Sequence, residues 1–375
     1  MTTSLRDKFE HLLSLADIEI GGHRPWDIHI LNDKLYERVL LGGSMALGES
    51  YMDHWWDCDA LDDFFFRILR FRLDTMVVPR TWLFDFLRAK LFNLQKPSRA
   101  FEIGAHHYDI GNNLYQNMLD KRMIYSCGYW DNASTLDEAQ EAKLDMICRK
   151  LDLRPGMKVL DIGCGWGGTA KFAAEHYHAE VVGVTVSEQQ ATYAKDLCKG
   201  LSVDIRMQDY RSVEGKYDRV LSVGMFEHVG SKNYSTFMHV VRDRLKDDGL
   251  FLLHTIGGNL SVIKTDPWIS RYIFPNSMLP SAKQICTASE GIFVLEDWHS
   301  FGPDYDKTLL QWFQNFQAHW DTLRALYDER FFRMWKYYLL ACAGSFRARM
   351  NQVWQIVFSP EGISGEPFRF GSKSR

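Results

Sequence analysis

Residues 159–168 read VLDIGCGWGG, an apolar run that ends in an aspartate and a loop rich in glycine. The apolar residues before the loop predict a buried strand, and TAKFAAEHY after it predicts a helix. Glycines at such a junction let a ligand approach the backbone where the next helix presents its N-terminus. The stretch therefore predicts the first strand, loop and helix of a nucleotide-binding type of α/β sheet.

The same alternation of strand and helix continues along the chain. Further strands are predicted at AEVVGVTVS (179–187), VDIRMQDY (203–210), YDRVLSVGMF (217–226) and LFLLHTIGG (250–258), and helices at 135–151, 188–200 and 235–249. Strands separated by helices indicate a doubly wound, Rossmann-like parallel sheet, so the fold class is α/β. The aromatic tail from Asp306 to Phe358 is predicted to be helical.

The loop glycines are compatible with two classes of cofactor. Gly163, Gly165 and Gly168 satisfy GxGxxG, which also occurs in NAD-binding proteins. Asp161, directly before the glycines, would repel a pyrophosphate but not a cationic sulfonium amino acid. The second strand ends in TVS, without the acidic residue expected for the ribose of NAD. The arrangement resembles class I S-adenosylmethionine-dependent methyltransferases.

Composition limits the remaining possibilities. The chain has 375 residues, enough for two domains, with 46% hydrophobic and 25% charged residues. Its net charge of -4 gives no reason to expect a nucleic-acid partner. The seven scattered cysteines never form CxxC, so neither a disulfide framework nor a metal site is predicted. No signal peptide or transmembrane segment is predicted, so we expect a cytoplasmic protein whose contact with lipid is peripheral.

The N-terminal part carries a basic, aromatic stretch. Eight basic residues against two acidic ones lie between Phe64 and Arg99. The basic residues are Arg67, Arg70, Arg72, Arg80, Arg88, Lys90, Lys96 and Arg99, interleaved with Phe64, Phe65, Phe66, Phe71, Trp82, Phe84, Phe86 and Phe92. A solvated surface over a core is one interpretation, and contact with an anionic membrane is the other.

Nine motifs in order extend the resemblance to a particular family. They are HHYDIGNNLYQNMLD, MIYSCGYW, LDIGCGWGG, TVSEQQ, GMFEHVG, LLHTIG, YIFPN, DYDKTL and FRAR. This set resembles the bacterial cyclopropane-fatty-acyl-phospholipid synthases, from about Leu12 to Phe358. The resemblance implies an N-terminal lipid-binding domain (1–95), a linker (96–105) and a catalytic domain (106–375). It also implies a homodimer at the inner face of the membrane.

The resemblance implies methylene transfer from S-adenosylmethionine to the cis double bond of an unsaturated phospholipid acyl chain. The alkene takes a methyl group and the resulting carbocation loses a proton, for which bound bicarbonate would be the base. Its implied ligands are Cys127, Glu227, His254, the Ile256 backbone and Tyr305. A carboxyl group beside an anion is costly unless they share a proton, so the pKa of Glu227 is expected to be raised.

The same resemblance implies the cofactor residues. They are Tyr125, Ser126, Asp161, Gly163, Cys164, Gly165, Thr185, Gln190, Gln208 and Asp209. His228 is predicted to be structural, because an extended backbone would turn it away from Glu227.

Two alternatives remain open. One is a related methyltransferase that adds a methyl group to the same alkene or to a small molecule, and the other is a non-catalytic lipid-binding protein. Without the motifs, Cys127 and His254 would be interpreted as buried core residues.

Overall fold

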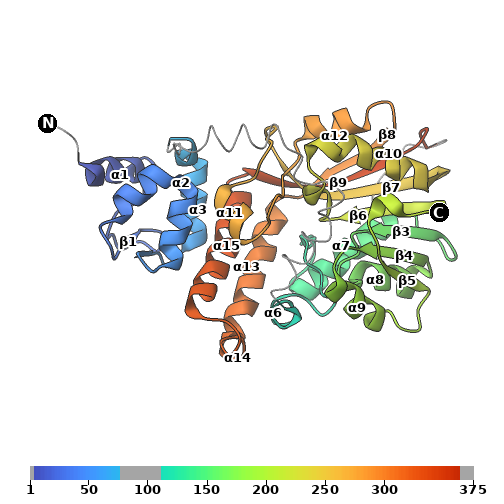
Figure 1. Cartoon of the computed structure of the whole chain (residues 1–375), viewed down its shortest axis with the longest axis horizontal. Coiled ribbons are helices and arrows are strands. Elements are labelled where there is room, and N and C mark those ends of the chain that lie inside the picture. The colour runs from blue at the N-terminus through green and yellow to red at the C-terminus, as the bar shows by residue number, and fades with distance from the viewer. Residues whose placement is uncertain (1–3, 77–110, 364–375) are drawn as a thin grey trace. The chain divides into compact units, whose positions relative to one another are not determined.

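The computed structural model describes residues 4–76 and 111–363, which form two compact units (Figure 1). One, here called the sheet unit, consists of residues 111–262, 277–304 and 352–363. The other, the helical unit, consists of residues 4–76, 263–276 and 305–351.

The sheet unit contains a seven-stranded sheet, within the described residues, of order β5-β4-β3-β6-β7-β9-β8. The strands are β3 (Lys158–Ile162), β4 (Glu180–Thr185), β5 (Val203–Met207), β6 (Tyr217–Val223), β7 (Leu245–Gly258), β8 (Val294–Ser300) and β9 (Asn351–Ser359). The pairs that join β5 through β7 are parallel, whereas β8 and β9 pair antiparallel. This confirms the predicted Rossmann-like parallel sheet and adds an antiparallel pair at one edge.

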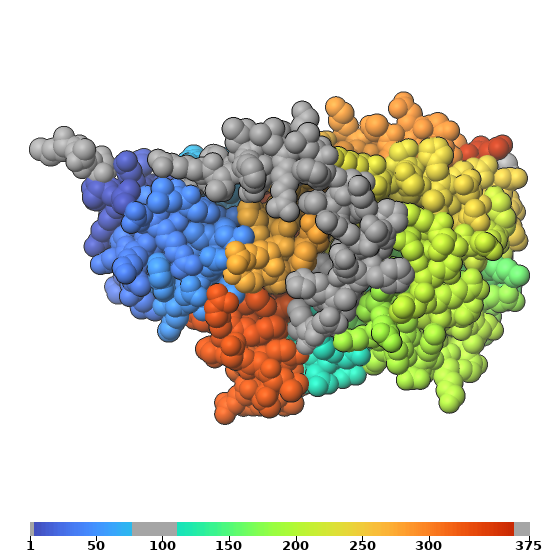
Figure 2. Space-filling model, viewed as in Figure 1, coloured from blue at the N-terminus to red at the C-terminus, as the bar shows by residue number. Residues whose placement is uncertain are grey.

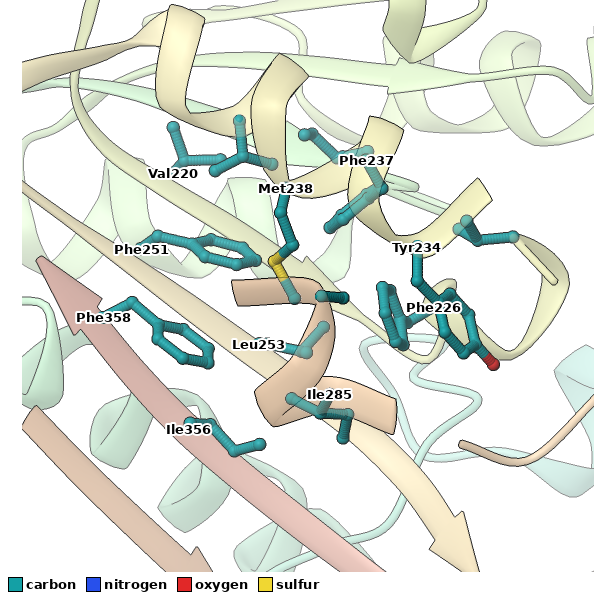
Figure 3. Close-up of a cluster of buried hydrophobic side chains, with 14 of the residues drawn as sticks. Val220, Phe226, Tyr234, Phe237, Met238, Phe251, Leu253, Ile285, Ile356 and Phe358 are labelled. Carbon is teal, nitrogen blue, oxygen red and sulfur yellow. The ribbon is translucent and has the colours of Figure 1, made fainter. Parts of the chain in front are cut away.

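The sheet unit also contains helices, several of which pack on the two faces of the sheet. They are α6 (Asn112–Met118), α7 (Leu136–Lys150), α8 (Gly168–Tyr177), α9 (Glu188–Leu197), α10 (Tyr234–Arg244) and α12 (Ala282–Ser289), with 3₁₀ turns η3 (Tyr210–Ser212), η4 (Phe226–His228) and η5 (Ser231–Asn233). Because side chains alternate along a strand, Val159 packs towards α7 and α8 while Leu160 packs towards α10 and α12. Figure 3 shows the core on the face covered by α10 and α12, where Phe237 and Met238 of α10 pack with Phe251 and Ile285.

The helical unit combines segments from both halves of the chain. Its elements are α1 (Leu5–Ser14), α2 (Leu35–Met52), α3 (Leu61–Arg70), η1 (Leu73–Thr75), α11 (Pro267–Tyr272), α13 (Pro303–Ala318), α14 (Trp320–Leu323), α15 (Glu329–Arg347) and the short strands β1 (His29–Ile30) and β2 (Trp56–Asp57). In the space-filling view the blue N-terminal residues form one closely packed body (Figure 2).

Two arginines of α15 join that helix to the N-terminal segment. Buried Arg333 donates to the backbone oxygens of Tyr51 (2.6 Å) and Trp56 (2.9 Å). Arg347 forms ion pairs with Asp62 and Asp63. The compact units therefore divide the chain differently from the predicted boundaries at 95 and 106, since residues 263–276 and 305–351 pack with the N-terminal segment. The linker at 96–105 lies outside the described residues.

The structure differs from the predicted elements at three places. The helix predicted at 235–249 ends at Arg244, and β7 begins at Leu245. The tail is not helical throughout, since β9 occupies 351–359. β8 was not predicted at all.

The membrane interpretation of the N-terminal aromatics is wrong for two residues. Phe64 and Phe65 are 1% and 7% exposed and pack against Trp56 and Tyr337, because they lie on the inner side of α3. Phe71 is exposed. The stretch Arg80, Trp82, Phe84, Phe86, Arg88, Lys90, Phe92, Lys96 and Arg99 lies outside the described residues. Among the residues that the structure describes, no helix is long and apolar enough to span a bilayer.

Candidate active site

The predicted site residues gather where the parallel strands end. The register pairs Asp161 with Leu221 on β6, and Val223 with His254 on β7. The Gly224 N–H donates to the His254 carbonyl (3.0 Å), which continues this pairing one residue beyond β6. Ligands of open α/β sheets bind at these carboxyl ends.

Two glycines shape the backbone of the loop. Gly163 has φ +85° and lies so close to Met225 that an added Cβ would be 2.8 Å from that side chain. Gly165 has φ +55°, and nothing lies within 4 Å of the place where its Cβ would be. The Cys164 side chain points towards Gly183, and the Cys164 N–H donates to the Val184 carbonyl (3.0 Å). The loop thus leaves an open cradle at Gly165.

Asp161 supplies a buried negative group next to this cradle. Its side chain is 1% exposed, and one carboxylate oxygen has no hydrogen-bond partner among the described residues. Burial raises the pKa of Asp161 to about 7, an effect that the charge of Lys143 opposes. An unsatisfied buried carboxylate beside an open backbone cradle fits a ligand that carries a positive group.

The next two strands bring four predicted cofactor residues together. Thr185 Oγ1 donates to Gln190 Oε1 (2.9 Å), and both residues are buried. The Gln208 N–H donates to the Thr185 carbonyl (2.9 Å), but the Gln208 amide turns away to the Ser212 carbonyl (2.8 Å). Asp209 forms an ion pair with Arg211 (2.8 Å).

Tyr125 and Ser126 lie beside the loop. The Tyr125 ring contacts Tyr115 of α6, which in turn contacts Trp166 of the glycine loop. Ser126 lies next to Gly224, since an added Cβ there would be 3.9 Å from Ser126 Cβ. Tyr115 and Trp166 lie within two of the quoted motifs but were not predicted as site residues.

Glu227 is held by a turn and an aromatic anchor. It lies in η4, where its neighbour Phe226 stacks on Tyr234 in the core of Figure 3. Glu227 Oε1 accepts a hydrogen bond from the Ile256 N–H (2.6 Å), whereas Oε2 has no partner among the described residues. Burial raises the pKa of Glu227 to about 7. The predicted direction of this pKa shift is confirmed, and burial in the protein suffices to cause it.

The backbone at His228 is not extended as predicted, because Phe226–His228 forms a 3₁₀ turn. Burial lowers the pKa of His228 to about 4, so its imidazole is neutral at physiological pH.

His254 and Cys127 complete the part of the predicted anion set that belongs to the sheet unit. His254 is 2% exposed, and its Nδ1 is hydrogen-bonded to Gln355 Nε2 of β9 (3.3 Å). Burial and the charges of Lys143 and Lys150 hold its pKa well below the usual range. Cys127 is fully buried, with Sγ donating to the Gly128 carbonyl (3.2 Å).

Tyr305 belongs to the helical unit, where its ring contacts Trp312 and Phe346. Three further polar residues, Gln140, Lys143 and Gln355, surround the predicted set and were missed from the sequence. The only local signal for Lys143 was its place in the apolar spacing of EAKLDMICRK, which also suits a solvated helix face.

Comparison with known proteins places these features in context. The family model described as mycolic acid cyclopropane synthetase matches residues 95–356. The cyclopropane-fatty-acyl-phospholipid synthase of Escherichia coli K12 is 54% identical over 351 residues, which cover 93% of this chain and 91% of that protein.

Solved structures agree with the sequence match. The cyclopropane synthase MmaA2 from Mycobacterium tuberculosis superposes with a TM-score of 0.65 at 31% identity, covering 71% of this chain and 99% of that one. The mycolic acid cyclopropane synthase CmaA1, complexed with SAH and CTAB, has a TM-score of 0.64 at 33% identity, covering 69% of this chain and 97% of that one.

Proposed function

Because the chain belongs to the cyclopropane synthase family of S-adenosylmethionine-dependent methyltransferases, we propose that it methylenates the cis double bonds of phospholipid acyl chains. The proposal takes its substrate class from the Escherichia coli relative, whose name specifies a fatty-acyl phospholipid. The alkene would gain a methyl group and lose one proton as the ring closes, a net gain of CH2.

The cofactor side of the proposal rests on the glycine cradle. Bound S-adenosylmethionine would supply an electrophilic methyl group on a sulfonium. Gly163 and Gly165 would let its polar part approach the backbone, while Asp161 would balance its positive charge. The hydrogen bond between Thr185 and Gln190 would fix the carboxyl end of β4 beside the cofactor.

Glu227 carries the chemical part of the proposal. A buried carboxyl with a pKa of about 7 and one unpartnered oxygen can hold a proton at neutral pH and donate it to an anion. Bicarbonate, as the proposed anion, would act as the proton acceptor. Glu227, neutral His254, Cys127 and the Ile256 backbone would orient it, and Tyr305 remains a prediction from the motif DYDKTL.

Peripheral membrane contact is the third part of the proposal. Arg70 of α3 is exposed and no described acid pairs with it, so its charge is available to an anionic lipid surface. Arg67, in contrast, pairs with Asp17 (2.8 Å) and lies over the Trp26 ring. The predicted homodimer is retained as an expectation.

The test is mass spectrometry of vesicles that contain a mono-unsaturated phospholipid, after incubation with the protein and S-adenosylmethionine, with bicarbonate present or depleted. A gain of CH2 without a remaining double bond, faster with bicarbonate, supports both the ring closure and the anion. A gain of CH2 with retained unsaturation indicates a methyl-branching enzyme. Unchanged lipid mass with cofactor bound points to a small-molecule acceptor.

A further inference from the structure

Lys143 is a fully buried lysine whose charge has no evident structural use. It lies in α7, is 0% exposed, and donates from Nζ to Ser126 Oγ (2.8 Å). Within residues 4–76 and 111–363, no carboxylate lies within ion-pair distance of this ammonium group. Burying such a charge without a carboxylate partner opposes folding. A methionine of similar shape would favour folding more, so the charge needs another explanation.

The hydrogen bond to Ser126 has a fixed direction. An ammonium group can only donate, so Ser126 Oγ must accept from Lys143 and its own O–H must point elsewhere. No described residue accepts that O–H. One turn earlier on α7, Gln140 Nε2 donates to the Ser126 carbonyl (2.8 Å). The backbone and the side chain of Ser126 are therefore both held by α7, with the hydroxyl proton left for a ligand.

Lys143 and Asp161 together give the site two opposite charges. Asp161 lies on the same face of the sheet as α7, has an unpartnered oxygen, and interacts electrostatically with Lys143. A free amino-acid group carries a carboxylate and an ammonium. Ser126 O–H, backed by the positive Lys143, suits the carboxylate, and Asp161 suits the ammonium.

We propose that Lys143 is a positioning residue for the amino-acid part of the cofactor, acting by fixing Ser126 as a hydrogen-bond donor. This inference rests on the cofactor proposed above, but it does not depend on the lipid substrate or on bicarbonate. It predicts that Lys143 matters for ligands with an amino-acid carboxylate and not for the nucleoside part.

The test compares S-adenosylhomocysteine with methylthioadenosine, which lacks the amino-acid group, by calorimetric titration of the full chain. Lys143→Met should weaken S-adenosylhomocysteine binding by about 10-fold or more and leave methylthioadenosine binding within about twofold. In a Ser126→Ala background the effect of Lys143→Met should largely disappear. Lys150→Met is the matched control, since Lys150 is buried on the same helix but pairs with Asp297 (2.8 Å).

Thermal unfolding separates positioning from structural support. Lys143→Met should unfold at the same or a higher temperature than the wild type, because it removes a buried charge. Equal loss of affinity for both ligands, or a lower unfolding temperature together with weaker binding, would overturn the proposal, and Lys143→Gln provides a second variant for the same comparison. If the wild-type chain binds neither ligand, the cofactor assignment itself fails.

Discussion

Gln355 Nε2 and His254 Nδ1 are hydrogen-bonded at 3.3 Å, deep inside the sheet unit, where both side chains are at most 2% exposed. The His254 imidazole is neutral and therefore carries a single N–H, since its pKa is held well below the usual range. An amide nitrogen donates, so Nδ1 accepts and the proton of His254 is on Nε2. Gln355 thus determines which nitrogen can donate to an anion.

Replacing Gln355 should change both the tautomer and the rate. We expect Gln355→Leu to reduce turnover about 10-fold, because losing one hydrogen bond costs roughly 1 kcal/mol or more. Nitrogen NMR of labelled histidine should show the Nε2–H tautomer in the wild type and a mixture in the variant. Gln352→Leu, on the same strand but bonded to Asn259, is the control. An Nδ1–H tautomer in the wild type would contradict this account.

Glu227→Gln should remove most turnover while S-adenosylhomocysteine affinity stays within about threefold, since the change leaves the glycine cradle intact. Steady-state rates and calorimetry on the same preparation measure the two quantities. An unchanged rate would remove Glu227 from the mechanism.

The same variant should alter the pH dependence of stability. Between pH 4.5 and about 7 the folded chain keeps a proton on Glu227 that the unfolded chain has released, so the free energy of unfolding falls as pH rises through this window. The loss reaches roughly 3 kcal/mol at most above pH 7. We expect Glu227→Gln to be more stable than wild type at pH 8 and equal to it near pH 4. Urea unfolding of both proteins at pH 4 and pH 8 measures the difference in the free energy of unfolding. A difference that is the same at both pH values would exclude the raised pKa of Glu227 as its cause.

Membrane binding should depend more on Arg70 than on Arg67. Arg70→Gln is expected to weaken partitioning into phosphatidylglycerol vesicles by about fivefold at low salt, because each basic residue near such a surface contributes roughly 1 kcal/mol. Arg67→Gln should have a smaller effect, since Asp17 already neutralises Arg67. Vesicle sedimentation across a salt series tests both variants. Equal losses would show that the ion pair does not restrain Arg67.

Packing between α15 and α3 should tolerate no added methyl group at Gly344. A Cβ there would lie 2.5 Å from the Asp62 carbonyl and 2.7 Å from the Phe66 N–H nitrogen. We expect Gly344→Ala to destabilise the protein by about 2 kcal/mol or more, measured as a lower unfolding temperature. Lys336→Ala on the same helix is the control, and its unfolding temperature should stay near that of the wild type.

The sequence was informative where a single strand is buried on both faces. The runs around Leu160, Val184, Val220 and Phe251 are largely apolar, so four of the five parallel strands could be predicted from burial. β5, in which only Ile205 is buried, was predicted from the alternation of strands and helices. β8 was not predicted, because VLEDWHS is an edge strand that mixes charged and apolar residues, and only Trp298 among its apolar residues packs on the core. β9 was not predicted as a strand, because its apolar residues follow the long helix α15 without a clear change in composition.

Only some residues of the candidate site could be predicted from the sequence. Glu227 and His254 follow strand ends, a position that sequence can identify. Gln355 and Lys143 cannot be found in this way, because each acts through a residue distant in sequence. Gln355 is 101 residues from His254, and Lys143 is 17 residues from Ser126. Their roles arise from tertiary contacts, as does the burial that raises the pKa of Glu227.

The position of α15 also affects how the chain emerges during translation. Tyr51 and Phe65 of the N-terminal segment contact Tyr337 of α15, so part of their cover comes from residues that are made more than 250 positions later. At a ribosomal rate of roughly 5–20 residues per second, these apolar side chains wait tens of seconds for their partners. The growing polypeptide therefore has a prolonged need for chaperone protection, and a ribosome that stalls before residue 329 leaves an N-terminal segment that cannot complete its core.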